Sequence, residues 1–265
     1  MSGDQLGTIA LCWRIERRDG VTIGLTAHDR DLEVEGLVHR AAPGMVPSAI
    51  ERSAGLDADT MDVTGALTGA AISEADLLAG RWDGARVTVF ACDWSGAGAP
   101  VPLGEGRIGA VETRGGMLTA ELRGASAALD RPVTEETSPE CRAELGDRRC
   151  RVAMAGRRKL VWVTAVAGNV LTLDRAEPLA NGYGGGRLRW LSGANSGLED
   201  AVAGSAGATL TLRRPPRFEA GGLAIVSEGC DKRLETCAGR FGNAVNFRGE
   251  PYLPGIDLLT RYPGG

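Results

Sequence analysis

The chain has 265 residues, enough for two or three small domains with cores of their own. Hydrophobic residues make up 43% of it, which excludes a globally disordered chain, and a net charge of −4 does not suit a dedicated nucleic-acid-binding protein. Glycine is abundant, at 39 residues, and only 5% of residues are aromatic, a combination that favours a mainly β fold with many tight turns.

The N-terminal part shows the alternation of apolar and polar residues that is typical of β-hairpins. Residues 11–15 and 21–25 alternate in this way on either side of the turn sequence Arg18-Asp19-Gly20. A second pair of short strands is expected on either side of Glu35-Gly36. Residues 73–79 predict a short helix, with Ser73 as its N-cap and Gly80 as its end.

Two further β segments complete this part. A strand is expected around Val87, Val89 and Ala91, and residues 107–123 predict two strands joined at Gly115-Gly116, with Ile108 and Leu118 pointing inward. We therefore expect a tube-like antiparallel β-sandwich or barrel with one helix over residues 1–125.

The charge changes sign near the end of this predicted domain. Residues 1–130 carry 11 Lys and Arg against 19 Asp and Glu, a net charge of −8, whereas residues 131–265 carry 19 against 15, a net charge of +4. Residues 161–227 contain about five short β runs and predict a small barrel or sandwich. We expect it to be inserted into a cysteine-containing domain made of residues 126–160 and 228–265.

Four of the six cysteines form two pairs that flank this small β-module. Cys141 and Cys150 precede it, and Cys230 and Cys237 follow it. The pairs can meet in space if the module begins and ends on the same side. With no signal-peptide pattern at the N-terminus, metal ligands are favoured over disulfides, and unconnected buried thiols remain an alternative.

Four thiolates suit either a [4Fe–4S] cluster or a structural zinc ion. Paired zinc ligands usually have about two to four residues between them, whereas these pairs have eight and six. If residues 230–237 formed one continuous helix, its two cysteines would lie about 10 Å apart along the axis, too far for one zinc ion. The spacing therefore favours a cluster without excluding zinc. Basic neighbours would either offset thiolate charge or form a solvated surface: Arg148, Arg149, Arg151, Lys232 and Arg233.

The other candidate residues favour structural explanations. Cys12 and Cys92 lie in expected strands and are interpreted as buried thiols. His28 lies beside Asp29 and Asp31, a pattern that fits a charged turn better than a catalytic or metal site. The sequence has no nucleophile elbow, zinc-protease or phosphate-loop motif, so we predict no enzymatic activity. It also has no apolar stretch of the length that crosses a membrane.

Motifs spread in order along most of the chain resemble those of phage and gene-transfer-agent baseplate hub proteins, a family similar to the iron–sulfur tail-tip protein of lambda-like siphophages. Together these motifs are specific, although each alone is weak. They are TAHDRDL at 26–32, PSAIE at 47–51, AGRWDGA at 79–85, ELRG at 121–124, C-x-x-x-LGD-x-RC at 141–150, RWLSGAN at 189–195, GCDKR-x-x-TC at 229–237 and F-x-N-x-x-NFRG at 241–249.

The resemblance implies a structural protein of the virion tail, assembled in the host cytoplasm. It implies a homotrimer between the distal tail ring and the central fibre protein, around a channel that DNA crosses without specific binding, and with no membrane insertion. The family's iron–sulfur ligands correspond to Cys141, Cys150, Cys230 and Cys237. One position departs from the family pattern, because Glu250 stands where an aromatic residue is expected.

Overall fold

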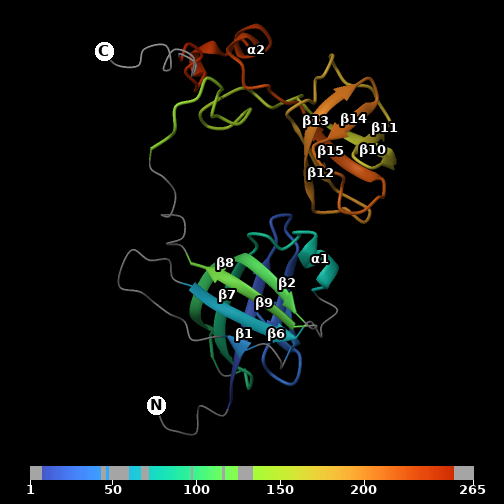
Figure 1. Cartoon of the computed structure of the whole chain (residues 1–265). Coiled ribbons are helices and arrows are strands. Elements are labelled where there is room, and N and C mark those ends of the chain that lie inside the picture. Colours follow the sequence, from blue (N-terminus) through green and yellow to red (C-terminus); the bar gives the residue numbers. More distant parts are fainter. Residues whose placement is uncertain are drawn as a thin grey trace. The chain divides into compact units, whose positions relative to one another are not determined.

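The computed structural model describes residues 8–42, 46–47, 60–66, 72–96, 98–114, 117–124 and 134–253. The chain divides into two compact units, residues 1–132 and residues 133–265, and each is described by itself (Figure 1). The predicted fold class is confirmed, because both units are built mainly of β-strands. Among the described helices, none is long and apolar enough to span a membrane.

The first unit contains one nine-stranded sheet with the order β3-β4-β2-β1-β7-β8-β9-β6-β5. Every neighbouring pair is antiparallel except β2 and β4, which are parallel. This one parallel pair departs from the antiparallel sheet that was expected, because the β3–β4 hairpin folds back beside β2. The strands are β1 Ile9–Glu16, β2 Thr22–Thr26, β3 Leu32–Val34, β4 Leu37–Ala41, β5 Val46–Pro47, β6 Thr60–Ala66, β7 Arg86–Asp93, β8 Val101–Arg114 and β9 Met117–Arg123.

Both predicted hairpins are confirmed. In the first, Trp13 lies opposite Leu25 in the β1–β2 register, and Gly20 takes a positive φ of 94° in the turn. In the second, Glu35 and Gly36 have φ values of 51° and 75°. Two consecutive left-handed residues twist the backbone in the sense that a two-residue hairpin requires.

The larger core of the first unit lies on one face of the sheet, under the predicted helix, and a smaller cluster of Ala10, Cys12, Phe90 and Cys92 is buried on the other face. Trp13 and Trp82 are almost completely buried in the larger core, and α1 (Glu74–Leu78) contributes Leu77. The Ser73 hydroxyl accepts the N–H of Asp76, and Gly80 follows the helix with a φ of 78°, as the sequence predicted.

Some expectations for this unit need correction or fall outside the described residues. The strand expected from residue 107 begins at Val101, and the short strands β5 and β6 were not predicted. Ile108 is buried as expected. The turn at Gly115-Gly116 and the side chain of Leu118 lie outside the described residues. The stretch containing His28 is a charged turn, where its Nδ1 accepts the N–H of Arg30 and lies 3.1 Å from Asp29 Oδ1.

The second unit contains a closed six-stranded barrel with the order β10-β11-β14-β13-β12-β15. Alternate residues point inward, so that side chains such as Leu188, Val202 and Leu210 are fully buried. Outward positions on the first strand include Leu160 and Trp162, each about half exposed. The strands are β10 Arg158–Ala167, β11 Val170–Leu173, β12 Arg187–Trp190, β13 Glu199–Ala206, β14 Thr209–Leu212 and β15 Gly222–Ser227.

The barrel confirms the predicted small β-module but has one strand more than the five expected. The additional strand is β13, whose sequence EDAVAGSA contains one large apolar residue, Val202. Small residues leave little alternation to detect, and pairing with β12 and β14 makes this segment a strand. The three-part domain division stays a prediction, because the compact units separate at residue 132 and not around the barrel.

Candidate metal centre

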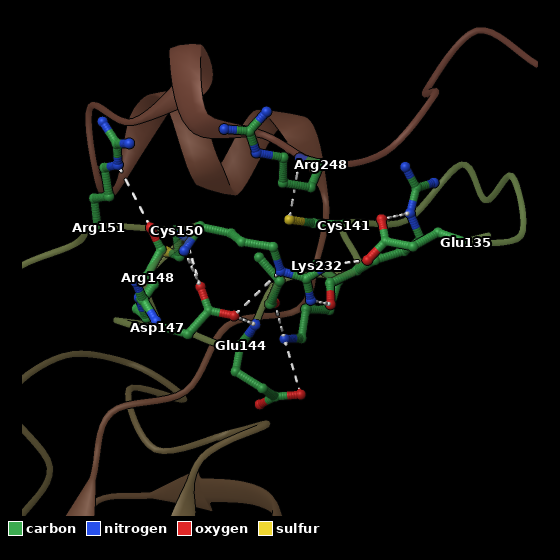
Figure 2. Close-up of polar contacts among 12 residues, drawn as sticks. Glu135, Cys141, Glu144, Asp147, Arg148, Cys150, Arg151, Lys232 and Arg248 are labelled. Carbon is green, nitrogen blue, oxygen red and sulfur yellow. Dashed lines mark hydrogen bonds and ion pairs between the residues drawn. The ribbon is translucent and has the colours of Figure 1, made fainter. Parts of the chain in front are cut away.

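The first cysteine pair lies in an irregular loop that precedes the barrel. Asp147 organises this loop, since its carboxylate accepts the backbone N–H groups of Glu144, Arg149 and Cys150 at 3.0, 2.8 and 2.6 Å (Figure 2). Burial raises the pKa of Asp147, but these three donors outweigh burial and the net shift is downward. The charged carboxylate therefore fixes the backbone that presents Cys150.

The second cysteine pair, Cys230 and Cys237, lies on either side of the N-terminus of a short helix. Cys230 follows β15, Lys232 has a φ of 66°, and α2 (Leu234–Gly239) begins only after Arg233. Cys237 is buried on this helix. Residues 230–237 therefore do not form one continuous helix, and the separation of about 10 Å that would have excluded zinc does not apply.

The two cysteine-bearing segments, 134–157 and 228–253, are joined by hydrogen bonds, and we call them together the clasp. Backbone N–H groups of Cys141 and Arg142 donate to the carbonyls of Lys232 and Arg248 at 2.9 and 3.0 Å. The Lys232 ammonium donates to the Ala143 carbonyl at 2.5 Å. Since Cys150 and Cys230 are 80 positions apart, these contacts close a long loop that contains the barrel.

Glu250, the residue that departs from the family pattern, supplies a further cross-link in the clasp. Both of its carboxylate oxygens accept from the Arg142 guanidinium, at 2.6 and 2.9 Å, and one also accepts the N–H of Ser138. Its own N–H donates to the Ser138 carbonyl. The hydrogen bonds from Arg142, followed by the one from Ser138, lower the pKa of Glu250 to about 2. A bidentate ion pair thus stands where the sequence comparison expected an aromatic contact.

The four thiols lie near enough to influence one another's ionisation. Burial raises the pKa of Cys237, and the negative charges of Cys141, Cys230 and Cys150 raise it further. The pKa of Cys230 is also raised, first by burial, with Cys141 among the charges that contribute. The charges of the other three cysteines thus act on Cys237, which places the four predicted site residues in one neighbourhood.

Hydrogen-bond donors point at three of the four sulfurs. The backbone N–H groups of Lys232 and Arg248 lie 3.4 Å from the Sγ atoms of Cys230 and Cys141, and Figure 2 shows the second of these contacts. The Asn243 side-chain amide lies 3.7 Å from Cys150 Sγ. Thiolates bound to iron–sulfur clusters commonly accept hydrogen bonds of this kind, so the chemistry of the site fits such a group.

The arrangement of the thiols differs from that of a closed single-ion site. Within the described ranges, no group of three or more His, Cys, Asp or Glu side chains is arranged to hold one metal ion. Electrostatic coupling acts over longer distances than metal–ligand bonds. The thiols are thus grouped, but they do not converge on a single point.

Two of the basic side chains near the cysteines have carboxylate neighbours, and the charge of Lys232 also acts on Cys230, whose pKa burial raises and the Lys232 charge partly lowers. Arg149 pairs with Glu135 and Asp147 and donates to the Arg142 carbonyl, and the Lys232 ammonium lies 3.6 Å from Glu144. Backbone and amide N–H groups contact the sulfurs of Cys141, Cys150 and Cys230. The role of Asn243 was not predicted from the sequence, although the residue lies in the motif F-x-N-x-x-NFRG.

The barrel contacts the clasp through its glycine-rich loop at residues 181–186. A Cβ on Gly229 would lie 2.0 Å from the Gly184 carbonyl oxygen, so only glycine allows the two backbones to approach this closely. Beside this contact, Arg240 donates to the carbonyls of Gly182 and Gly229 and to Glu228. The predicted turn thus also holds the segment that leads into Cys230.

Cys12 and Cys92 are buried in the sheet of the first unit, as predicted. Their Sγ atoms lie 3.3 Å apart, on β1 and β7, and Cys12 also contacts the Thr26 hydroxyl at 3.4 Å. Burial, followed by the contact with Cys12, raises the pKa of Cys92 to about 12. Both thiols belong to the smaller buried cluster of the sheet.

Comparisons with known proteins agree with this architecture. The model of the baseplate hub protein N-terminal attachment domain matches residues 2–153, and that of a conserved hypothetical phage protein matches residues 181–257. One similar solved structure, described as the virion of a native gene transfer agent particle, shares 35% identity and a TM-score of 0.82, over 98% of this chain and 94% of its own. No curated protein matches the chain.

The first family model covers more than half of the chain, and the solved structure matches almost all of it. The resemblance that the sequence motifs indicated is therefore confirmed. The chain belongs to the baseplate hub protein family of phage and gene-transfer-agent tails.

Proposed function

We propose that this protein is a non-enzymatic baseplate hub whose C-terminal unit is held together by a [4Fe–4S] cluster bound to Cys141, Cys150, Cys230 and Cys237. One observation carries the proposal: two segments separated by the barrel bring four coupled thiols together where their backbones hydrogen-bond. A structural protein needs its segments held in place, and nothing in the clasp requires a reaction.

The composition of the clasp supports a structural role for the cofactor. Its ordered residues include few regular elements, namely α2 and the short 3₁₀ helix Ala244–Asn246. Cys150 and Cys237 are themselves among its few buried residues. A bound cluster would supply the cross-link that a small apolar core cannot, and its binding free energy would then contribute to folding.

The family resemblance supports a place for the hub in the tail. We infer a homotrimer that joins the distal tail ring to the central fibre protein around the DNA channel, after assembly in the host cytoplasm. In this proposal residues 1–125 form the wall of the channel, and residues 1–130 carry a net charge of −8. An acidic wall repels phosphate groups, which supports passage of DNA without binding.

Purification of the protein without oxygen tests the cofactor directly. We expect iron and acid-labile sulfide in equal amounts, with the broad visible absorbance of an iron–sulfur cluster. One zinc ion per chain without iron would contradict the cluster and identify a zinc-stabilised hub of the same architecture. Zinc is the second candidate because the break before α2 frees Cys230 and Cys237 from a rigid helical spacing.

Two further measurements test the remaining parts of the proposal. Light scattering of the purified protein should give the mass of a trimer, and a stable monomer at high concentration would contradict the assembly. A peptidoglycan-release assay should show no activity. Release that is abolished by a point mutation would instead identify a tail-associated hydrolytic enzyme.

A further inference from the structure

Asn243 connects one cysteine of each pair. Its side chain is buried, 8% exposed, and its Nδ2 donates to the Cys150 carbonyl at 2.6 Å and approaches Cys150 Sγ at 3.7 Å. Its backbone N–H donates to the Cys237 carbonyl at 2.9 Å. A single residue thus contacts the first pair through its side chain and the second pair through its backbone.

The orientation of this amide is determined by its neighbours. A carbonyl oxygen can only accept a hydrogen bond, so the group that faces Cys150 must be the NH₂ end. On the other side, Asn243 Oδ1 accepts from Asn246 Nδ2 at 2.7 Å. Both ends of the amide therefore have defined partners, and an aspartate of the same shape could satisfy only one of them.

We propose that Asn243 is the positioning residue of the cysteine site: it orients the Cys150 thiolate toward a bound cluster and donates an N–H···S hydrogen bond to it. This inference rests on the proposed cluster. A donor to a ligand sulfur withdraws electron density from the metal centre and stabilises its more reduced state. Asn243 therefore raises the reduction potential of the cluster and slows the loss of its metal.

The substitution Asn243→Asp tests this role, because it keeps the shape, removes the donor and adds negative charge. Anaerobically purified variant and wild type are compared in a spectroelectrochemical titration and in a chelator challenge that follows iron loss. We expect a more negative midpoint potential and a loss of metal affinity of about 10–100-fold.

Asn195→Asp is a matched control. Asn195 is also buried and also uses its amide to hold backbone, donating to the carbonyls of Phe218 and Ala220 and accepting the N–H of Phe218. It lies in the barrel, so its variant should lose stability but keep the potential of wild type. Equal potentials and equal iron loss in Asn243→Asp and wild type would overturn the proposal.

A second variant tests the positioning role of Asn243 even if the protein binds no cluster. If wild type contains no iron, the proposed cofactor fails, and the positioning role is tested by thiol labelling of Asn243→Ala with iodoacetamide and mass spectrometry. Loss of the amide should speed labelling of buried Cys150 several-fold and leave that of partly exposed Cys141 unchanged. An unchanged labelling pattern would show that Asn243 does not position Cys150.

Discussion

The barrel and the clasp belong to the same unit but are held together in different ways. The barrel closes on itself, and its interior contains fully buried apolar side chains such as Leu171, Leu188 and Leu210. In the clasp the contacts are mostly backbone hydrogen bonds, ion pairs and thiols. The first kind of structure gains its stability from burial of apolar area, and the second needs cross-links between segments that are distant in sequence.

This difference explains why the cysteines are found only outside the barrel within the described part of the second unit. A closed barrel has no free sheet edge and has an apolar core of its own. It can therefore be inserted between the two halves of the clasp without depending on them for its stability. If the thiols bind a cluster as proposed, the clasp is the region whose stability should depend on it. The following predictions test this contrast in the full chain.

The largest effect is expected from Cys150→Ser. Loss of one of four ligands should remove the metal and unfold the clasp, with loss of the trimer or aggregation, because metal binding and folding are coupled there. Hydrogen exchange followed by mass spectrometry should show lost protection in residues 134–157 and 228–253, while the barrel strands stay protected. Cys92→Ser, in the sheet of the first unit, should keep its full metal content. A tail-competent Cys150→Ser protein would show that the site is dispensable.

The second-largest loss of stability is expected from truncating a side chain in the barrel core. Leu210→Ala should cost about 2–5 kcal/mol, because it leaves a cavity among fully buried side chains. Chemical unfolding, with the barrel followed by hydrogen exchange, measures this loss. The same cost should appear with and without metal. Leu160→Ala, at a half-exposed position on the outside of the barrel, should have a much smaller effect. A cost that disappeared on metal removal would contradict the independence of the two regions.

A smaller effect is expected at the contact between the two regions. Gly229→Ala places a methyl group 2.0 Å from the Gly184 carbonyl oxygen, and the backbone there can move only if the loop separates from the clasp. We expect a loss of about 1–3 kcal/mol and lower metal retention. Gly239→Ala, where a Cβ meets nothing within 4 Å, is the control. Equal stability of the two variants would mean that the close contact does not hold Cys230 in place.

The smallest effect is expected from Glu250→Gln, and it should depend on pH. The pKa of Glu250 is lowered from 4.5 to about 2 by Arg142. A lowered pKa stabilises the folded state above pH 4.5, and this contribution is lost as the pH falls toward 2.

Unfolding curves between pH 2 and 6 should show that wild type loses more clasp stability on acidification than Glu250→Gln does. Glu219→Gln, which removes an exposed carboxylate with one long contact to the Gly168 N–H, should behave like wild type. Parallel curves for wild type and Glu250→Gln would show that the ion pair between Glu250 and Arg142 does not stabilise the clasp.

Local patterns explain which parts of the fold were predictable. The hairpin at Glu35-Gly36 and the cap at Ser73 depend on a few neighbouring residues, so the sequence predicts them directly. Strand β13 was missed because EDAVAGSA has only one large apolar side chain. The parallel pairing of β2 with β4 depends on where a hairpin folds back, which no local pattern contains.

The candidate site shows the same division. The four cysteines and their position on either side of the barrel are visible in the sequence, whereas the roles of Asp147, Asn243 and Glu250 are not. Asn243 and Glu250 act on groups brought near by folding, Asn243 on Cys150, 93 positions away, and Glu250 on Arg142, 108 positions away. The partners of these two residues are determined by the closing of the long loop and not by spacing. Asp147 instead accepts from residues only two or three positions away, in a local turn whose role becomes visible only once the cysteine site is assembled.

The sequence by itself determined the mainly β fold, the turns and the four candidate cysteines, because periodicity, glycine and cysteine spacing act through local geometry. Only the tertiary structure decided that the helix begins after Cys230, that backbone and amide N–H groups contact three of the sulfurs, and that an ion pair occupies the place of an aromatic residue. These features require groups that are distant in sequence to meet, and that meeting is set by closure of the barrel between the two halves of the clasp.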